Sequence, residues 1–334
     1  MTPYFNISLR ITIADKYQFY VAESIHIENS TEKISDTAKV TLPREFKQVR
    51  QDDQNTSLAG ERLLDFIKVG DKIKIELGYD GDLQSEFEGY ITKVGAEIPI
   101  ELECEDEMYQ LKKMKPVNKL FKNVALKEVV QFLAPGYNVN CKYEVKTGKI
   151  AFDNVTPYNA LLDLKNKGYP FRFFFRDKTL MVHMNIDPDI QQQHQFNLNR
   201  NVRKGGDLKY ETKEDRKFWI KAVSKQVGTS KEVTYEFGDK GESERKLDCP
   251  SGLNKNELKI WAENYYKKLN YDGYGGGFDS WCYPRTKAGD SANLTDPNYP
   301  NKHRDGVYYI NEVTIDVNQS EGIKRNNKLT FKIK

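Results

Sequence analysis

The sequence lacks any long hydrophobic run. No apolar stretch approaches the roughly 20 residues that a membrane-spanning helix needs, so membrane insertion is not expected. The first ten residues, Met1 to Arg10, do not combine a basic segment with an apolar core, which argues against a secretory signal. The pattern predicts a chain that is made without a signal peptide.

Cysteine and histidine are also scarce, with four residues of each type among 334. The cysteines lie too far apart for a disulfide framework or a Cys-x-x-Cys metal site and are expected to be reduced thiols. The histidines show no His-x-x-x-His or His-Glu-x-x-His spacing. These residues are Cys104, Cys141, Cys249, Cys282, His26, His183, His194 and His303. We therefore expect no metal site and no cofactor.

An excess of charge of one sign is absent as well. Lysine and arginine number 52, and aspartate and glutamate 49, so the net charge is only +3. This balance disfavours a general nucleic-acid binder, because such a protein needs a basic field to hold phosphates. The length of 334 residues is enough for about two domains, each with its own core.

Motifs of catalysis are missing too. The sequence has no Gly-x-Ser-x-Gly nucleophile elbow, and the glycines of 273–277 lack the spacing of a pyrophosphate-binding turn. Five acidic residues could supply the carboxylate pair of a glycoside hydrolase: Glu101, Glu103, Glu105, Asp106 and Glu107. Alternation places the first two on the polar face of a strand, and the other three are expected to begin a helix that ends at Lys113. A solvated face is favoured, and we predict no catalytic residues and no enzyme activity.

The sequence is rich in β-hairpin patterning, most clearly from Phe66 to Val94. Ile73, Ile75 and Leu77 alternate with charged residues, as in a strand with one buried face. Asp80–Gly81 supplies the positive φ angles that a tight hairpin turn prefers. This stretch is expected to be the organising hairpin of the first half.

A similar pattern recurs near the C-terminus. Gly289–Asp290 begins a short strand, and Tyr308–Tyr309–Ile310 lies in a return strand, as Gly70–Asp71 and Tyr90–Ile91 do in the first hairpin. Such residues are common in strands and turns, so coincidence is the alternative. The recurrence favours two copies of one β unit in the chain.

The expected elements divide the chain into three parts, at 1–115, 116–186 and 187–334. Alternation in 6–13 and 17–21 predicts an opening hairpin. The first part, with about five or six strands, is expected to be a small barrel or sandwich. A polar loop covers 43–60 and is too long for a simple connection, so it is either mobile or used for contact.

The middle part reads as a small α+β module. An apolar stripe at Leu126–Leu133 predicts one helix. A second helix has Thr156 as N-cap and Pro157 at its first position, and it ends before Gly168. Strands are expected at 137–145, 171–176 and 179–184.

The last part begins with a linker at 187–206, which has little apolar content. Strands are expected at 208–212, 218–224 and 233–237, and these begin the second β unit. A helix at 254–270 is inserted there, with Asn254 and Glu257 spaced as in a capping box.

Aromatic residues gather in two regions, Phe171–Phe175 and Tyr271–Tyr283. Both compositions suit a small core and also an interface. The core interpretation is favoured for the first region, and the two are evenly balanced for the second.

The chain resembles the baseplate hub proteins of contractile phage tails, the late control protein D family, which has relatives in contractile injection systems and prophages. Each motif is weakly specific, but their order along nearly the whole chain matches. The motifs are Val69–Tyr79, Phe87–Ile91, Thr156–Leu164 with Gly168–Tyr169, Gly289–Asp290, Gly306–Ile310 and Leu329–Ile333.

The resemblance implies a mainly β fold with α+β insertions, in which two tube-protein-like β-barrel domains flank a small α+β module. It implies a homotrimer whose ring of six similar barrels acts as a symmetry adaptor between a threefold central spike and a sixfold tail tube. The implied partners are the tail tube protein, the central spike protein and other baseplate proteins. DNA or an effector would pass as non-specific cargo. The implied location is the virion tail baseplate, after synthesis in the bacterial cytoplasm.

Two other functions remain open. One is a tail-tip cell-wall hydrolase, and the other is a monomeric carbohydrate-binding β module that uses Tyr271, Tyr274 and Trp281. Because the sequence ends with a strand at Lys334, no fused spike or wall-degrading domain is expected. The loop 295–304 and the helix 254–270 are candidates for partner contacts.

Overall fold

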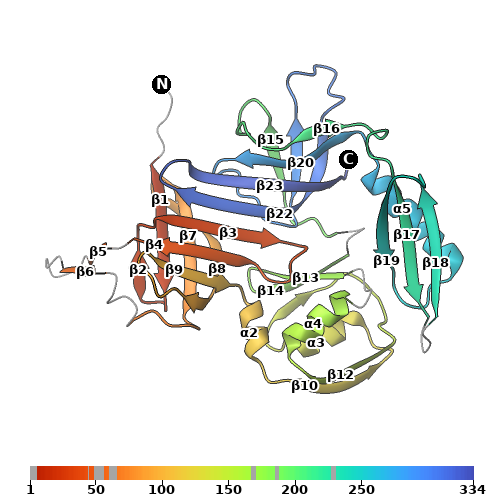
Figure 1. Ribbon diagram of the computed structural model, residues 1–334, viewed down its shortest axis with the longest axis horizontal. Helices are drawn as coiled ribbons and strands as arrows, with labels where there is room; N and C mark the ends of the chain where they lie inside the picture. The colour runs from red at the N-terminus through yellow and green to blue at the C-terminus, as the bar shows by residue number, and fades with distance from the viewer. Residues whose placement is uncertain are drawn as a thin grey trace.

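Strands from both ends of the chain form one large sheet in the computed structural model, which describes residues 6–43, 45–48, 56–59, 66–166, 171–184, 188–226 and 231–334. The hydrogen-bonded order is β16-β20-β23-β22-β3-β4-β9-β8-β7-β1-β2, with β21 on β22 and β15 on β21 (Figure 1). The thirteen strands are β1 (Ile7–Ile13), β2 (Tyr17–Phe19), β3 (Ser24–Ser30), β4 (Thr37–Leu42), β7 (Lys72–Tyr79), β8 (Asp82–Val94), β9 (Ile100–Glu105), β15 (Gln193–Asn197), β16 (Lys209–Glu211), β20 (Gly273–Ser280), β21 (Ser291–Thr295), β22 (Gly306–Asn318) and β23 (Gly322–Lys332).

The two halves of this sheet meet where β3 pairs antiparallel with β22. Ile27 lies opposite Ile315 and Ile25 opposite Val317, and all four side chains are buried in one continuous core. The mainly β class is thus confirmed. The two expected barrels are not separate, because β3 pairs with β4 of its own half on one edge and with β22 of the other half on the other edge. Among the described residues, no strand pairing closes either half into a barrel.

The predicted hairpins form for local reasons. β7 and β8 are joined through Asp80 (φ 53°) and Gly81 (φ 86°), the positive angles that the Asp-Gly pair predicted. β1 and β2 pair through a turn with positive φ at Ala14 and Asp15. β21 and β22 pair as the second expected hairpin, with Ser291 opposite Tyr309.

The α+β part has its own core. The predicted stripe is confirmed in α3, where Leu126, Val129, Val130 and Leu133 are fully buried. Its elements are α2 (Met108–Lys113), β10 (Val117–Lys122), α3 (Leu126–Leu133), β11 (Asn138–Asn140), β12 (Lys149–Val155), α4 (Pro157–Asn166), β13 (Phe171–Arg176) and β14 (Thr179–Met184).

In this region the predicted N-cap is confirmed, whereas one strand and one helix are shorter than expected. The Thr156 hydroxyl accepts the N–H of Asn159 at 3.4 Å, as expected of an N-cap, whereas Gly168 lies outside the described residues. The expected strand at 137–145 is reduced to β11, because only three residues pair with β14. The expected helix at 105–113 begins at Met108, because Glu105 still pairs with Thr37 in the large sheet.

The last part also contains a separate three-stranded sheet, made of β17 (Phe218–Lys225), β18 (Glu232–Gly238) and β19 (Ser243–Asp248), with α5 (Lys255–Leu269) packed against β17 and β18. The segment expected to be a linker, 187–206, contributes β15 to the large sheet. Its composition is polar because β15 pairs only with β21 at an edge, and only Phe196 of this strand is buried.

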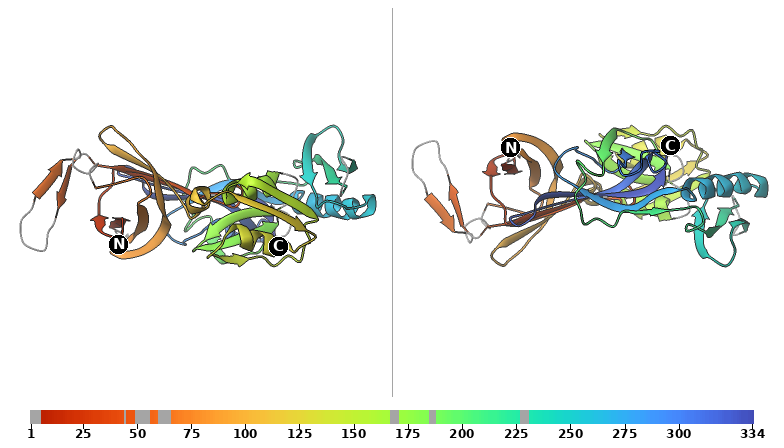
Figure 2. Two further views of the ribbon diagram at one scale, coloured as in Figure 1. Left: turned by 90° about the horizontal axis from the view of Figure 1, so that it is seen from below. Right: turned by 90° about the horizontal axis from the view of Figure 1, so that it is seen from above.

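The molecule is elongated (Figure 2). A hairpin of β5 (Glu45–Gln48) and β6 (Thr56–Ala59) lies at one end, and α5 with its small sheet lies at the other. The expected polar loop at 43–60 is therefore partly a hairpin, and residues 49–55 are outside the described residues. The α+β part lies beside the large sheet between these ends.

The capping box of α5 gives a first prediction. The Asn254 side chain accepts the N–H groups of Asn256 (2.9 Å) and Glu257 (3.0 Å), and Glu257 accepts the N–H of Asn254 (2.7 Å). Asn254→Ala should lower the free energy of unfolding by about 1 kcal/mol in urea titrations, because two N–H groups lose their acceptor. Asn256→Ala is the matched control, since Asn256 contributes its N–H but not its side chain. An equal loss in both variants would contradict the cap.

Candidate functional site

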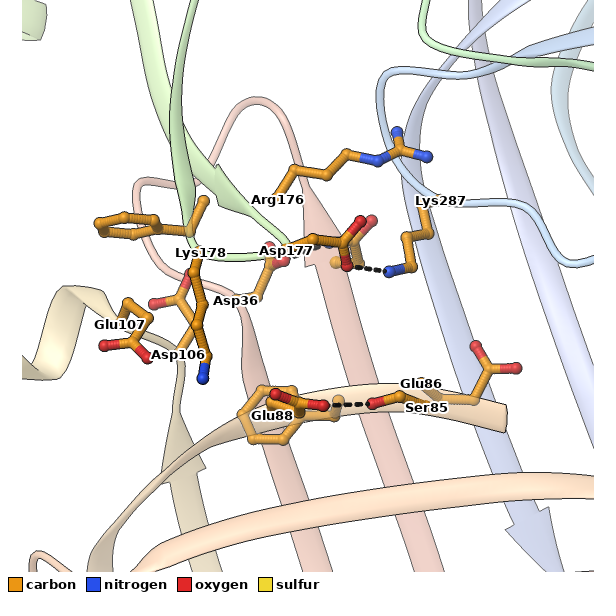
Figure 3. A pocket seen from close by; sticks show the side chains of 13 residues that line it. Asp36, Ser85, Glu86, Glu88, Asp106, Glu107, Arg176, Asp177, Lys178 and Lys287 are labelled. Atoms are coloured by element: carbon orange, nitrogen blue, oxygen red, sulfur yellow. Dashed lines mark hydrogen bonds and ion pairs between the residues drawn. The ribbon is translucent and has the colours of Figure 1, made fainter. Parts of the chain in front are cut away.

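A pocket of about 210 Å³ lies where the large sheet meets the α+β part (Figure 3). Its wall comes from β8, from the segments before β4 and α2, from the β13–β14 turn and from the segment between β20 and β21. The lining is mostly charged, with six carboxylates and three basic groups. The charged residues are Asp36, Glu86, Glu88, Asp106, Glu107, Asp177, Arg176, Lys178 and Lys287.

Glu86 is directed toward the C-terminal half by a β-bulge. In the β7–β8 ladder Ile75 faces Phe87 and Glu76 faces Ser85, so Glu86 is the extra residue that the ladder skips. Its Oε1 accepts hydrogen bonds from Arg285 Nη1 (2.6 Å) and Arg325 Nη2 (2.7 Å). The side chains of Glu86 and Arg325 are only 2% and 1% exposed. The bulge therefore places a buried ion pair between β8 and β23.

A second ion-pair group joins the α+β part to β21. Asp290 Oδ1 lies 2.9 Å from Arg176 Nη1 of β13, and Asp290 Oδ2 lies 3.0 Å from His194 Nε2 of β15. Burial alone would raise the pKa of Asp290, but His194 and Arg176 together lower it below its ordinary value. Gly289, at φ +98°, makes the turn that presents this carboxylate. The second Gly-Asp motif of the sequence is thus a contact between parts of the fold.

The five acidic residues singled out in the sequence do not converge on one site. Each of the three glutamates on β9 has a lysine partner: Glu101 with Lys39 (2.8 Å), Glu103 with Lys93 (2.8 Å) and Glu105 with Lys112 (2.5 Å). The solvated-face interpretation suits these three.

The last two residues of that acidic run behave differently. Asp106 is buried, and Glu107 Oε2 accepts the Tyr137 hydroxyl at 2.6 Å. The sequence carried a signal for Asp106, since it continues the alternation of Ile100, Leu102 and Cys104 on the buried face.

The four histidines lie apart. His26 pairs with Asp316 (2.7 Å), His194 with Asp290, and His303 packs on the Tyr299 ring at 5.1 Å. Across the part of the chain that the structure describes, no group of three or more His, Cys, Asp or Glu side chains could hold a metal ion. The four cysteines are free thiols.

His183 gives a prediction for acid pH. Its ring is buried against Phe174, and burial lowers its pKa from 6.5 to about 4. Between these values the unfolded chain binds a proton that the folded chain does not, so stability falls as the pH drops, by up to about 3 kcal/mol. His183→Gln should make the free energy of unfolding fall less between about pH 6.5 and about pH 4.5 in urea titrations.

The matched control for this variant is His303→Gln, because His303 is an exposed imidazole. It should keep the wild-type slope. A His183→Gln slope equal to that of wild type would show that this ring does not contribute to acid sensitivity.

The two aromatic regions differ in exposure. Phe171, Phe173, Phe174 and Phe175 are all buried, so the core interpretation is confirmed there. The second region is divided: Tyr271 and Tyr274 are buried, and Trp281 and Tyr283 are 42% and 37% exposed. A sugar-stacking platform that includes Tyr271 and Tyr274 is not available on this surface.

The loop 295–304 is held in place by stacking. The Arg304 guanidinium lies 3.8 Å from the ring centre of Tyr299 and 4.3 Å from that of Tyr210. The Tyr274 hydroxyl donates to Asp296 at the start of the loop. This loop is therefore an ordered surface beside β16.

Within the described ranges, no helix is long and apolar enough to cross a membrane. No family model matches the sequence, and no curated protein matches it either.

Solved structures do match, over almost the whole chain. A tail protein from Neisseria meningitidis MC58 is 13% identical, with a TM-score of 0.62 over 97% of this chain and 96% of that one. The 43 kDa tail protein of prophage MuSo2 from Shewanella oneidensis is 13% identical, with a TM-score of 0.63 over 98% of both chains. The E. coli c3393 protein, described as a type VI secretion component similar to T4 tail proteins gp27 and gp5, is 10% identical, with a TM-score of 0.55 over 96% of this chain and 76% of that one.

The fold is therefore that of phage tail proteins and their type VI secretion relative. The resemblance that the ordered motifs predicted is confirmed at the level of the fold.

Proposed function

We propose that this chain is the structural baseplate hub of a contractile tail, and that it is not an enzyme. The observation that carries this proposal is the match to two tail proteins over nearly the full length of each chain, without a large unmatched domain on either side. In this role the protein binds its neighbours and lets cargo pass. Its net charge of +3 suits a channel that must release DNA or an effector.

The finer proposal is a homotrimer that forms a ring with pseudo-sixfold symmetry between the central spike and the tail tube, in the virion baseplate. Two β-rich halves in each chain, carrying the repeated hairpin pattern, would let three copies present six similar surfaces. The pairing of β3 with β22 supports this arrangement, because it fixes the two halves rigidly to one another. Tube, spike and other baseplate proteins would be the partners.

Negative-stain images and light scattering of the purified chain test the proposal. We expect trimers with a threefold outline and a central hole, at high protein concentration or after addition of the tube protein. A chain that stays monomeric at all concentrations, with and without the tube and spike proteins, would overturn the trimer.

The hydrolase alternative has a separate test. Purified protein would first have to degrade peptidoglycan, and neutralising the acidic residues from Glu101 to Glu107 would then have to abolish that activity. Since the three glutamates of β9 are paired with lysines, the geometry does not favour this outcome.

A further inference from the structure

Two buried aspartates lie opposite each other at the end of the β4–β9 ladder. Thr37 pairs with Glu105, and the N–H of Asp106 donates to the carbonyl of Asp36 at 3.1 Å, so Asp36 and Asp106 occupy the next position of the ladder. Directly opposite residues share one face of an antiparallel pair, with Cβ atoms about 4.5–5.5 Å apart. That face is the buried one, since Ala38 and its partner Cys104 lie on it, and the two aspartates are 8% and 5% exposed.

Hydrogen bonds satisfy three of the four carboxyl oxygens. Asp36 accepts from the N–H of Ser30 (2.9 Å) and from the Asn29 amide. Asp106 Oδ1 accepts from the N–H of Met108 and from the Ser35 hydroxyl, both at 3.0 Å. Asp106 Oδ2 is buried without a partner among the described residues. A buried carboxylate oxygen without a partner is costly, and a like charge directly across the ladder increases that cost.

The surrounding charges do not neutralise the pair. Lys287 attracts the Asp36 carboxylate, but it forms its ion pair with Asp177 at 2.8 Å. Arg176 is engaged by Asp290, and Arg285 and Arg325 are engaged by Glu86. Lys178 extends along the wall that holds Asp106 and Glu107 (Figure 3), but it forms no ion pair with a described residue. The other groups that face the pair are acidic: Glu28 from β3, Glu88 from β8 and Glu107 before α2.

A metal ion does not suit this position either. In the described part of the chain no three acidic or histidine side chains converge as a metal site would require. The remaining way to hold two opposed carboxyls out of water is a proton.

We propose that Asp36 and Asp106 share one proton, and that its loss loosens the junction between the large sheet and the α+β part. Three contacts make the pair suited to this role. Asp106 holds the first turn of α2 through Met108, its N–H ties it to Asp36, and both residues line the pocket that the β13–β14 turn covers. Two ionised carboxylates in these positions repel each other across that junction.

The direction of the pH effect follows from burial. Burial raises the pKa of Asp36 to about 7, and burial together with the Asp36 charge raises the pKa of Asp106 well above its ordinary value. Above about pH 4, the ordinary pKa of an aspartate, the folded chain binds protons that the unfolded chain has released, so the junction weakens as the pH rises from there through neutrality. This inference goes beyond the proposed function and holds whether or not the chain forms a trimer.

Hydrogen exchange of the full-length protein tests the inference, with wild type and Asp106→Asn compared at the same pH. Asparagine keeps the shape of the neutral carboxyl and cannot ionise. At about pH 9 the amides of α2 and the β13–β14 turn should exchange about 10- to 100-fold more slowly in Asp106→Asn than in wild type, and at about pH 4 the two proteins should differ by no more than about twofold. Amides of β17, far from the pair, should exchange equally in both. Glu103→Gln, on the exposed face of β9, is the matched control and should behave as wild type.

Infrared spectroscopy of the wild-type protein keeps the inference testable if a variant does not fold. A protonated carboxyl band should persist at neutral pH and disappear as the pH rises. Its absence at neutral pH, or equal exchange of wild type and Asp106→Asn at high pH, would overturn the inference. Stabilisation of the wild type by added Ca²⁺ or Mg²⁺ that Asp106→Asn lacks would also overturn it, because a metal ion would then occupy the place assigned to the proton.

Discussion

Glu86→Gln is expected to lower the free energy of unfolding by about 3–5 kcal/mol, the usual cost of removing one partner from a buried ion pair. Glu86 is the acceptor for both Arg285 and Arg325, and Arg325 is 1% exposed. Glutamine keeps the size of the side chain but leaves two guanidinium groups without a counter-charge. The midpoint of urea unfolding, followed by tryptophan fluorescence, measures the loss.

Two variants separate this effect from a general loss of charge. Glu103→Gln removes one half of an exposed pair with Lys93 and should change stability by no more than about 1 kcal/mol. Adding Arg325→Met to Glu86→Gln should recover part of the loss, because an apolar side chain of similar length removes the uncompensated charge. A Glu86→Gln protein as stable as Glu103→Gln would contradict the assigned role of the bulge.

Local patterns were sufficient to predict the β1–β2, β7–β8 and β21–β22 hairpins and the helices α3, α4 and α5. The β7–β8 turn depends on Asp80–Gly81, and the start of α5 depends on Asn254 and Glu257, so each signal lies within a few residues of its effect. The pairing of β3 with β22 joins opposite ends of the chain, and no local pattern specifies it. Alternation shows only that each strand has a buried face, not which strand will lie beside it.

The polar contacts inside the fold were missed because their residue types are usually exposed. β23 has the polar run Lys324–Lys328, yet Arg325 and Asn327 occupy buried positions between Ile323 and Leu329. Asp106, directly after β9, is likewise a residue of a usually exposed type at a buried position. In both places the alternation of buried and exposed positions predicted burial better than residue type did. Nothing comparable in the sequence indicated that the β7–β8 ladder would skip Glu86. A β-bulge shifts the alternation of buried and exposed positions on one strand only.

Phe173→Ala is expected to lower the free energy of unfolding of the α+β part by about 3–5 kcal/mol, because a fully packed aromatic ring is replaced by a cavity. Phe173 is 1% exposed in β13, within the core built by α3 and α4. Leu120→Ala is the control: Leu120 is 47% exposed on β10, so its truncation should have little effect. Hydrogen exchange, measured separately for β13–β14 and for β22–β23, shows which part of the molecule opens.

The same measurement on Met108→Ala tests where the α+β part begins. Met108 and Leu111 of α2 are fully buried in the core that contains Phe173, although they precede the predicted boundary at residue 116. If α2 belongs to this core energetically, Met108→Ala should accelerate exchange in β13–β14 as Phe173→Ala does and leave β22–β23 protected. Faster exchange in β22–β23 would instead assign α2 to the large sheet and support the predicted boundary. Equal acceleration in both sheets would mean that the parts unfold together, as one cooperative unit joined by contacts such as the ion pair of Arg176 with Asp290.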